Sequence, residues 1–565
     1  MDDLQDPITR RQRLESLRST LKKDRSSWIE HWREISENLQ PRLGRFIVSD
    51  TNKGTKRHQK IHDNTGTLAA RTLSAGLMAG QTSPARPWFK LELEDRDLME
   101  SADVKAWLFD VTTILRRIFS ASNTYRALHS MYDELGLFGT AANLVVDDFN
   151  DVLHNHPYTI GEYAVAANEK GLVDTLVSER SLTVRQCVER FGLANCSNTI
   201  KDLWNRHSIY TPVTVVHVIR PRDKRDQSKL DSRNMAYESV YYEEGRDSAG
   251  FLGESGFRKL PLLAPRWDVT GNDVYGKSPG MECLGDVKQL QFQQLRKAQG
   301  IDYMVNPPLQ VPTVYKEAEN QRLPGGVMFV DQVSPGGGVR TAFEVNLNLN
   351  HLLEDIQDIR ARVRSGFFAD LFLMLANAPA DGRMTATEVA ERHEEKLLML
   401  GPVLERQHNE LLSPLIDIAF DKAARAGILP PPPPETQGMD LKVEFISVLA
   451  QAQRAVGAQS TDRMLGTIAS MAQLWPEVRH KVNALQAVDE YAEMYGVPPR
   501  IIVPDDQAQA AIEADARAAQ AAQAAAMAKP VADAAKATGE IDVDNTQQVL
   551  TQFMGYDSPS PQEVA

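Results

Sequence analysis

Two long helical segments that enclose a proline- and glycine-rich stretch constrain this chain more than any other feature. Apolar residues recur every three or four positions in residues 281–304 and again from about 348 to 375, as on one face of a helix. Leu284, Val287, Gln291 and Leu295 share one side of the first segment. Between the two, NPPLQVP, LPGGVMFVD and SPGGGVR predict a small module of strands and loops. Each helix has one apolar stripe, so the hairpin needs neighbours that cover it.

The residues before this hairpin predict an α+β body. Helices are expected at 64–79, 102–119 and 125–138, and the first of these is rich in small residues that let helices approach closely. Alternating, β-branched segments predict strands, and the clearest are ANLVVDD, LVDTLVSE, VTVVHVI and SVYYEE. His154 and His156 are expected in a surface loop.

One continuous N-terminal helix is predicted by an apolar stripe that ends before Pro41. Its members are Leu14, Leu17, Leu21, Trp28, Trp32, Ile35 and Leu39. We expect the stripe to pack on a core. The basic run RRQRLESLRSTLKKDR on the same helix has nucleic acid or an acidic neighbour as alternative partners, but interleaved acidic residues favour an ordinary helix surface.

A third long helix is predicted from 386 to about 425, after a loop. Thr385 and Glu388 have capping-box spacing at its start, and Pro402 and Pro414 should kink it. The segment LKVEFISVL predicts a strand, and the Ala/Gln-rich residues after 505 predict a further helix. The fold class is therefore α+β, predominantly α.

The charge and the cysteines limit the function. The formal net charge is −13, whereas a protein that grips nucleic acid broadly is usually basic. The three cysteines are widely spaced and predict neither a disulfide framework nor a zinc site. We expect no signal peptide, no membrane-spanning helix, no cofactor, no metal at His58 and His62, and no catalytic residues.

One motif favours an enzyme. GNDVYGKSPG matches the phosphate-binding pattern G-x-x-x-x-G-K-S from Gly271 to Ser278. A working P-loop needs a buried strand before it and a helix whose first turn holds the Lys-Ser pair. Here Pro279 and Gly280 follow Ser278 at once. We favour a turn in which the glycines serve backbone geometry, and a P-loop packaging ATPase is the alternative.

The order of these elements resembles that of the portal, or head-to-tail connector, proteins of tailed bacteriophages, particularly short-tailed, podovirus-type phages. The segments that carry the resemblance cover most of residues 25–425. They are RSSWIEHWREISENLQPR, IHDNTGTLAARTLSAGLMAGQTSPARPWFKLEL, DVYGKSPGMECLGDVKQLQ, MVNPPLQVP and RMTATEVAERHEEKLLMLGPVLERQHNELLSPLI.

The resemblance implies a portal fold in which every part of the chain has a place in a closed ring. The implied parts are a wing (1–270), stem helices (271–304 and 346–375), a clip (305–345), a tunnel loop (376–384), a kinked helix and strand returning to the wing (385–449), a crown (450–504) and a C-terminal barrel helix with a tail (505–565).

The resemblance also implies a function. The ring, typically of twelve subunits, would sit at one capsid vertex as the channel for double-stranded DNA in packaging and ejection. The terminase large subunit, a tail adaptor, the major capsid protein and scaffolding proteins would contact it, in the virion and, during assembly, in the host cytoplasm. Asn377, Asp381 and Arg383 would face DNA, and Arg322, Phe329 and Arg340 would face partners at the clip. Another virion protein, such as a tail adaptor, is a second alternative.

Overall fold

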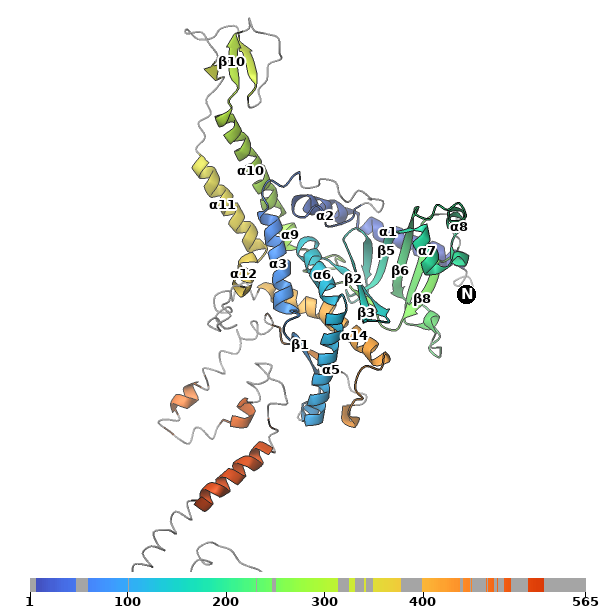
Figure 1. The fold of residues 1–565 in the computed structure, drawn as a ribbon, viewed down its shortest axis with the longest axis vertical. Coiled ribbons are helices and arrows are strands. Elements are labelled where there is room, and N and C mark those ends of the chain that lie inside the picture. The colour runs from blue at the N-terminus through green and yellow to red at the C-terminus, as the bar shows by residue number, and fades with distance from the viewer. Residues whose placement is uncertain are drawn as a thin grey trace, which may run out of the picture. The chain divides into compact units, whose positions relative to one another are not determined.

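The computed structural model divides into residues Met1–Pro476 and Glu477–Ala565, which are described separately (Figure 1). Within these, the structure describes residues 7–46, 59–99, 101–229, 231–245, 250–312, 325–330, 340–341, 349–376, 399–436, 441–447, 449, 464, 466–471, 475, 482–488, 503 and 507–522.

The N-terminal segment forms two helices rather than the single predicted one. Helix α1 (Pro7–Asp24) and helix α2 (Ser26–Asn38) meet at Arg25. The predicted stripe is buried, but it serves two cores. Leu14 and Leu21 pack on a five-stranded sheet, while the residues of α2 join the main core. The apolar stripe therefore changes its packing partner, from the five-stranded sheet to the main core, close to the break at Arg25.

The main core lies among helices α2, α3 (Thr65–Gln81), α5 (Ala102–Ala121) and α6 (Thr124–Phe138), which confirm the helices predicted there. A three-stranded sheet, in the order β3-β2-β9, adds its apolar side chains to this core. Its antiparallel strands are β2 (Ala142–Asp148), β3 (Val152–Tyr158) and β9 (Leu262–Leu263). His154 and His156 therefore lie in strand β3, and the prediction of a loop there is wrong.

An antiparallel five-stranded sheet forms the other part of the body and confirms the remaining strand predictions. Its strands, in spatial order, are β4 (Tyr163–Ala167), β5 (Val173–Thr183), β6 (Pro212–Pro221), β7 (Tyr237–Glu243) and β8 (Gly253–Phe257). Helices α7 (Val184–Phe191) and α8 (Asn198–Asn205) cover a smaller core at one end of this sheet.

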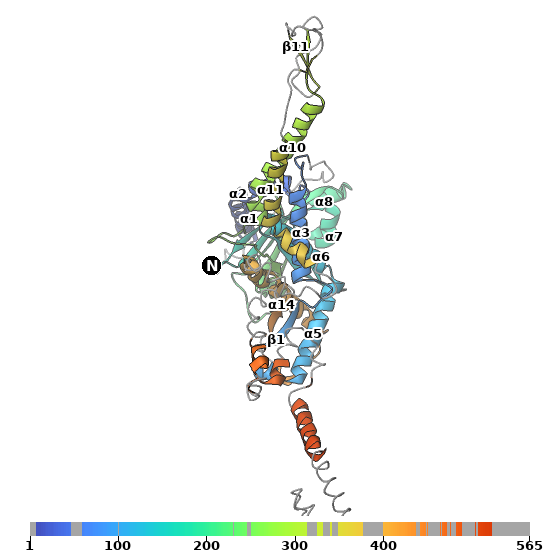
Figure 2. The same ribbon diagram turned by 90° about the vertical axis from the view of Figure 1, so that its left-hand side faces the viewer.

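The two long helices lie side by side, as both views of the ribbon show (Figures 1 and 2). After the short helix α9 (Pro279–Glu282), helix α10 (Leu284–Val305) leads to a small sheet, and helix α11 (Leu349–Gly366) returns from it. In this sheet, β10 (Leu309–Pro312) lies between β11 (Val327–Val330), which is parallel to it, and β12 (Arg340–Thr341), which is antiparallel. We call α10 with α11 the rod, and these three strands the distal sheet.

The second predicted helix of the rod is broken near its end. Helix α12 (Ala369–Ala376) follows α11 after Phe367 and Phe368, and Phe368 has a φ of 53°. A phenylalanine rarely adopts this left-handed conformation. Phe367 is completely buried at the break, so burial of the ring there offsets the cost of leaving the helix.

The third predicted helix, for which Pro402 and Pro414 predicted a kink, is interrupted by a π-helical turn. Residues 399–407 are helical, a π-helical turn follows at His408–Leu412, and helix α14 (Ser413–Arg425) completes the segment. The π turn directly precedes Pro414, whose missing amide proton disturbs the α-helical pattern. The predicted capping box at Thr385 and Glu388 lies outside the described residues.

The remaining described elements are short. Strand β13 (Leu441–Phe445), predicted from LKVEFISVL, pairs antiparallel with β1 (Phe89–Leu93), and helix α4 (Arg96–Met99) follows β1. In the C-terminal unit, residues 507–522 are helical and almost wholly exposed, which confirms that part of the predicted Ala/Gln helix.

Candidate functional site: the rod and its anchor

The rod is an antiparallel helix pair held by apolar side chains. Asp286, near the start of α10, contacts Arg362, near the end of α11. Gln293, further along α10, contacts Asp355, which lies earlier in α11. The two helices therefore run in opposite directions. The apolar side chains near the body are almost completely buried, and they are Val287, Leu290, Ile356, Ile359 and Val363.

Helix α3 packs closely against α10 of the rod and against α12 because two of its contact positions are glycines. A Cβ atom on Gly76 would lie 2.1 Å from Cγ of Phe372 in α12. A Cβ on Gly66 would lie 2.7 Å from a methyl of Leu39 and 3.2 Å from one of Val287. The small-residue composition of this helix, seen in the sequence, therefore serves the seating of the rod against the body.

A buried carboxylate, Asp63, fastens both rod helices to the start of α3. Its Oδ2 accepts hydrogen bonds from Gln294 Nε2 of α10 at 2.9 Å and from Arg360 of α11 at 2.7 and 3.0 Å. Its Oδ1 accepts bonds from the amide and the hydroxyl of Thr65 at 2.8 and 2.5 Å. One side chain thus ties together three helices.

Gln291 completes the anchor through the backbone. Its Oε1 accepts the amides of His62 at 2.6 Å and Asp63 at 2.8 Å, and its Nε2 donates to the carbonyl of Asp63 at 2.7 Å. Sequence analysis placed Gln291 in the apolar stripe of its helix but did not identify Asp63. A polar residue inside an apolar stripe was the signal, because buried polar groups require partners.

The anchor carboxylate remains ionised. Burial favours a higher pKa for Asp63, but the hydrogen bonds from Thr65 and the ion pair with Arg360 outweigh burial and lower this pKa. The side chain of Asp63 is 3% exposed, against 39% for Arg360. The anchor is therefore an ion pair in which the carboxylate of Asp63 is shielded from water and the guanidinium of Arg360 is partly exposed.

The rod exposes apolar side chains on two flanks. Phe292 and Leu295 lie on one side of α10, and Phe292 is 57% exposed. Ile301, Met304 and Val305 lie roughly on the opposite side, nearer the distal sheet, and Val305 is 78% exposed. Exposed apolar groups collected on one element indicate a surface for protein partners.

The P-loop-like segment is a backbone junction. The amide of Gly276 donates to Thr140 Oγ1 at 2.8 Å, and that of Lys277 donates to the carbonyl of Asp268 at 2.7 Å. Buried Ser278 donates to the Leu137 carbonyl at 2.7 Å and caps α9 by accepting the amide of Met281 at 3.1 Å. The amides of Gly276 and Lys277 and the hydroxyl of Ser278, which a phosphate would need, therefore already have partners within the chain, and this disfavours a nucleotide cradle.

The glycines of this segment serve backbone geometry, as predicted, two of them through close approach and one through a positive φ. A Cβ on Gly276 would lie 2.2 Å from the carbonyl oxygen of Gly139, and one on Gly280 would lie 2.6 Å from that of Leu137. Gly271 has a φ of 58°. Lys277 is exposed and pairs with Glu282 at 2.8 Å.

The basic run on α1 pairs with acidic residues of its own chain. Arg10 contacts Glu238 and Glu254 at 2.6 and 2.7 Å, and Arg18 contacts Glu179 at 2.6 Å. Arg18 is 7% exposed on its side chain, so the prediction of an ordinary solvated surface is wrong for these residues. The acidic neighbour was the better of the two alternative partners, because the five-stranded sheet carries carboxylates under α1.

Most of the predicted site residues lie outside the described residues, namely Asn377, Asp381, Arg383 and Arg322. Phe329 lies in β11 opposite Val311, and Arg340 lies in β12 opposite Gln310. The distal sheet therefore brings Phe329 and Arg340 to the two sides of β10.

The described parts of the chain offer neither a metal centre nor a membrane span. No group of three or more metal-ligating side chains occurs there, and His58 lies outside those parts. No helix among them is long and apolar enough to cross a membrane.

Comparisons with known proteins agree on one family. The chain matches the family described as bacteriophage head to tail connecting protein over residues 11–503. It is 54% identical to "Probable portal protein" of Bordetella phage BPP-1 over 97% of this chain and 99% of that protein. It is 47% identical to "Portal protein" of Salmonella phage epsilon15 over 94% and 96% of the two chains.

A solved structure, "Virion of native gene transfer agent (GTA) particle", aligns with a TM-score of 0.30 and 11% identity. The alignment covers 71% of this chain and 95% of that one. This similarity is too weak to define the fold.

Proposed function

Because this chain belongs to the head-to-tail connecting, or portal, family of bacteriophages, we propose that it assembles as a closed ring of twelve copies at one capsid vertex. The ring surrounds the channel through which double-stranded DNA enters the capsid and leaves it. The chain has a structural role in the virion, and ATP hydrolysis belongs to a separate terminase.

The observation that carries the ring is the pair of apolar flanks on α10. A cyclic ring is built from heterologous contacts, in which one patch of each copy meets a different patch of the next. The flank with Phe292 and Leu295 and the opposite flank with Ile301, Met304 and Val305 provide two such patches. The rod of one copy would lie between the rods of its two neighbours.

The parts of the chain then take these roles. Residues 1–270 form the wing, 271–304 and 346–375 the stem, 305–345 the clip, and 376–384 a tunnel loop. Residues 385–449 return to the wing, 450–504 form the crown and 505–565 the barrel and tail. In the tunnel loop, Asn377, Asp381 and Arg383 face DNA. The net charge of −13 per copy disfavours tight binding of phosphates, so DNA slides through the channel.

The distal sheet is the proposed docking site for the terminase large subunit and for a tail adaptor. It lies at the far end of the rod from the body (Figure 1), where Arg322, Phe329 and Arg340 would contact these partners. The wing would contact the major capsid and scaffolding proteins. The ring forms in the host cytoplasm and remains at the portal vertex of the virion.

Electron microscopy of negatively stained, purified protein tests the ring. We expect the wild-type chain to form rings with a central channel. Phe292→Glu should yield mainly monomers or incomplete arcs, because it places a charge in the contact between rods. The control is Phe149→Glu, since Phe149 is fully exposed in the turn between β2 and β3.

Two results would overturn the proposal. One is a wild-type protein that remains monomeric or forms open filaments at the concentrations used for imaging. The other is a protein whose rings persist with Phe292→Glu and are lost with Phe149→Glu.

A further inference from the structure

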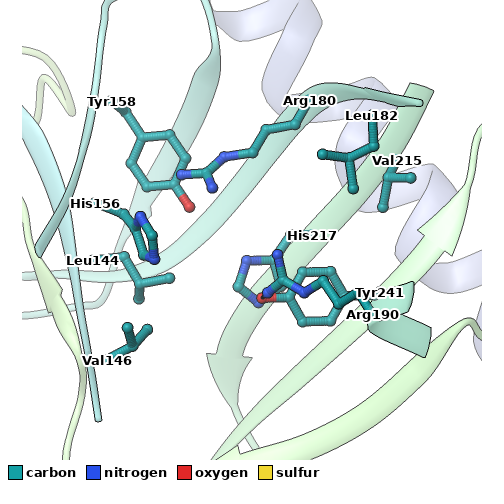
Figure 3. Close-up of a pocket in the computed structure, with 10 residues that line it drawn as sticks. All are labelled: Leu144, Val146, His156, Tyr158, Arg180, Leu182, Arg190, Val215, His217 and Tyr241. Atoms are coloured by element: carbon teal, nitrogen blue, oxygen red, sulfur yellow. Dashed lines mark hydrogen bonds between the residues drawn. The ribbon is translucent and has the colours of Figure 1, made fainter. Parts of the chain in front are cut away.

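A small cavity lies between the three-stranded sheet and the five-stranded sheet (Figure 3). Its volume of about 20 Å³ is enough for about one water-sized group. Strands β2, β3, β5, β6 and β7 and helix α7 line it. The polar lining residues are His156, Tyr158, Arg180, Arg190, His217 and Tyr241. Figure 1 places these sheets on the side of the body away from the rod.

Two arginines face this cavity, each held against a tyrosine ring. The guanidinium of Arg180 lies 4.5 Å from the ring centre of Tyr158, and that of Arg190 lies 4.8 Å from that of Tyr241 (Figure 3). Arg190 also donates to Tyr241 Oη at 2.9 Å. Stacking fixes the plane of a guanidinium and leaves its edge, which carries the donors, available.

Neither arginine has a carboxylate partner among the side chains described. No ion pair joins Arg180 or Arg190 to an acidic residue there, whereas Arg10 and Arg18 of α1 each contact two or more. Glu243 lies on the same face of β7 as Tyr241, but it does not line the cavity. The lining therefore carries positive charge that the chain itself does not neutralise.

The two histidines that line the cavity carry no charge at neutral pH, so its positive charge comes from the arginines. Burial first, and then the nearby Arg180, lower the pKa of His156 to about 4 and that of His217 well below its usual range. His217 bonds Ser239 Oγ through Nε2 at 2.9 Å and stacks on Tyr241 with ring centres 3.8 Å apart. Both rings are neutral at pH 7 and form rigid walls.

We propose that this cavity binds one carboxylate group from an acidic segment of a partner protein. Two arginines that line the same cavity can both donate hydrogen bonds to one carboxylate. The cavity is too small for a nucleotide, but a glutamate or aspartate on a flexible stem can place one carboxylate oxygen, which is a water-sized group, inside it. A duplex phosphate lies within a continuous backbone and cannot enter in this way. The site is independent of the proposed ring.

Fluorescence anisotropy of a fluorescein-labelled hexaglutamate peptide, at low salt and with the full chain, tests this site. The wild-type protein should bind the peptide, and Arg180→Gln with Arg190→Gln should weaken binding by about tenfold or more. Arg185→Gln is the matched control, because Arg185 is another exposed arginine of α7 that does not line the cavity and pairs with Glu189 at 2.7 Å. It should change binding by less than about twofold.

Conservative variants separate binding from folding. Arg180→Lys with Arg190→Lys keeps both charges but loses the forked donors, and it should bind the peptide more weakly than wild type while melting at a similar temperature.

Several outcomes would overturn the proposal. These are a wild-type protein that does not bind the peptide, equal losses in the glutamine pair and in Arg185→Gln, or full binding by the lysine pair. Inorganic phosphate that binds at this site when the peptide does not would indicate a free-anion site instead. Binding of a 20-base-pair duplex that the glutamine pair abolishes would indicate a nucleic-acid site.

Discussion

Arg360 of α11 donates two hydrogen bonds to a single oxygen, Oδ2, of Asp63, a residue 297 positions earlier in the chain. The same oxygen accepts a hydrogen bond from Gln294 of α10. Both helices of the rod are therefore held by one atom at the entrance to α3. The angle of the rod to the body depends on this contact as well as on apolar packing.

Replacement of Asp63 by Asn should lower the free energy of unfolding by about 2 kcal/mol, because hydrogen bonds to a buried charge are lost. The loss is smaller than for a fully buried ion pair, since Arg360 stays partly hydrated. Urea unfolding followed by tryptophan fluorescence measures it. The control is Glu34→Gln, which removes an ion pair to Lys288 with both side chains about half exposed, and which should cost less than about 0.5 kcal/mol. Equal losses of unfolding free energy in Asp63→Asn and Glu34→Gln would show that the Asp63 contacts stabilise the protein no more than an exposed ion pair does.

Replacement of Gly139 by Ala should destabilise the protein by more than about 3 kcal/mol. Gly139 has a φ of 77°, and its Cβ would lie 2.2 Å from the backbone oxygen of Gly276, which cannot rotate away. Soluble yield and thermal melting report the effect. Gly285→Ala in α10 is the opposite case, with nothing within 4 Å of the added Cβ. It should be neutral or stabilise by about 0.5 kcal/mol, and a harmful Gly285→Ala would count against this explanation.

Replacement of Lys277 by Ala should leave stability within about 0.5 kcal/mol of wild type, because its ion pair with Glu282 is exposed on both sides. Ser278→Ala should cost about 1–2 kcal/mol, since it removes a helix cap and a buried hydrogen bond. A fluorescent ATP analogue should bind neither the wild type nor either variant. Wild-type binding that Lys277→Ala abolishes would restore the ATPase interpretation.

Glu134 should make the protein less stable as the pH rises. Burial raises the pKa of Glu134 to about 8, despite hydrogen bonds from Thr159 and Ile160. Between the ordinary glutamate pKa of about 4.5 and this value, the folded state binds the proton more tightly than the unfolded state does. The contribution of Glu134 to stability is thus complete below about pH 4.5 and is lost as the pH rises towards 8.

The variant Glu134→Gln removes this dependence. Its melting temperature, measured from pH 5 to 8, should fall less with rising pH than that of the wild type. Glu169→Gln, in an exposed turn, should follow the wild-type curve. Parallel curves for Glu134→Gln and the wild type would show that Glu134 titrates normally.

The sequence predicted the elements well wherever periodicity was long. The rod, the helices α3, α5 and α6 and three strands of the five-stranded sheet, β5, β6 and β7, follow from local sequence patterns, whereas β4 and β8 were not predicted. Short-range patterns do not show where a helix changes its packing partner. The breaks at Arg25 and at Phe368 depend on cores built by distant segments, so they could not be predicted from local residues.

The anchor and the cavity were missed for a related reason. Asp63 gains its role from α10 and α11, and the cavity brings His156 of β3 together with Arg190 of helix α7. No local pattern marks either. A polar residue within an apolar stripe, as at Gln291, is the one signal in the sequence that indicated a buried partner.

The ion pairs of α1 also limit when this helix can reach its folded position during synthesis of the chain. Arg10 binds Glu254, 244 positions later, and Arg18 binds Glu179, 161 positions later. Chains fold as they emerge from the ribosome, yet this helix cannot complete its contacts until the strand that carries Glu254 has been translated. Arg10 must therefore wait, without its two carboxylate partners on the five-stranded sheet, for more than 200 further residues to follow it.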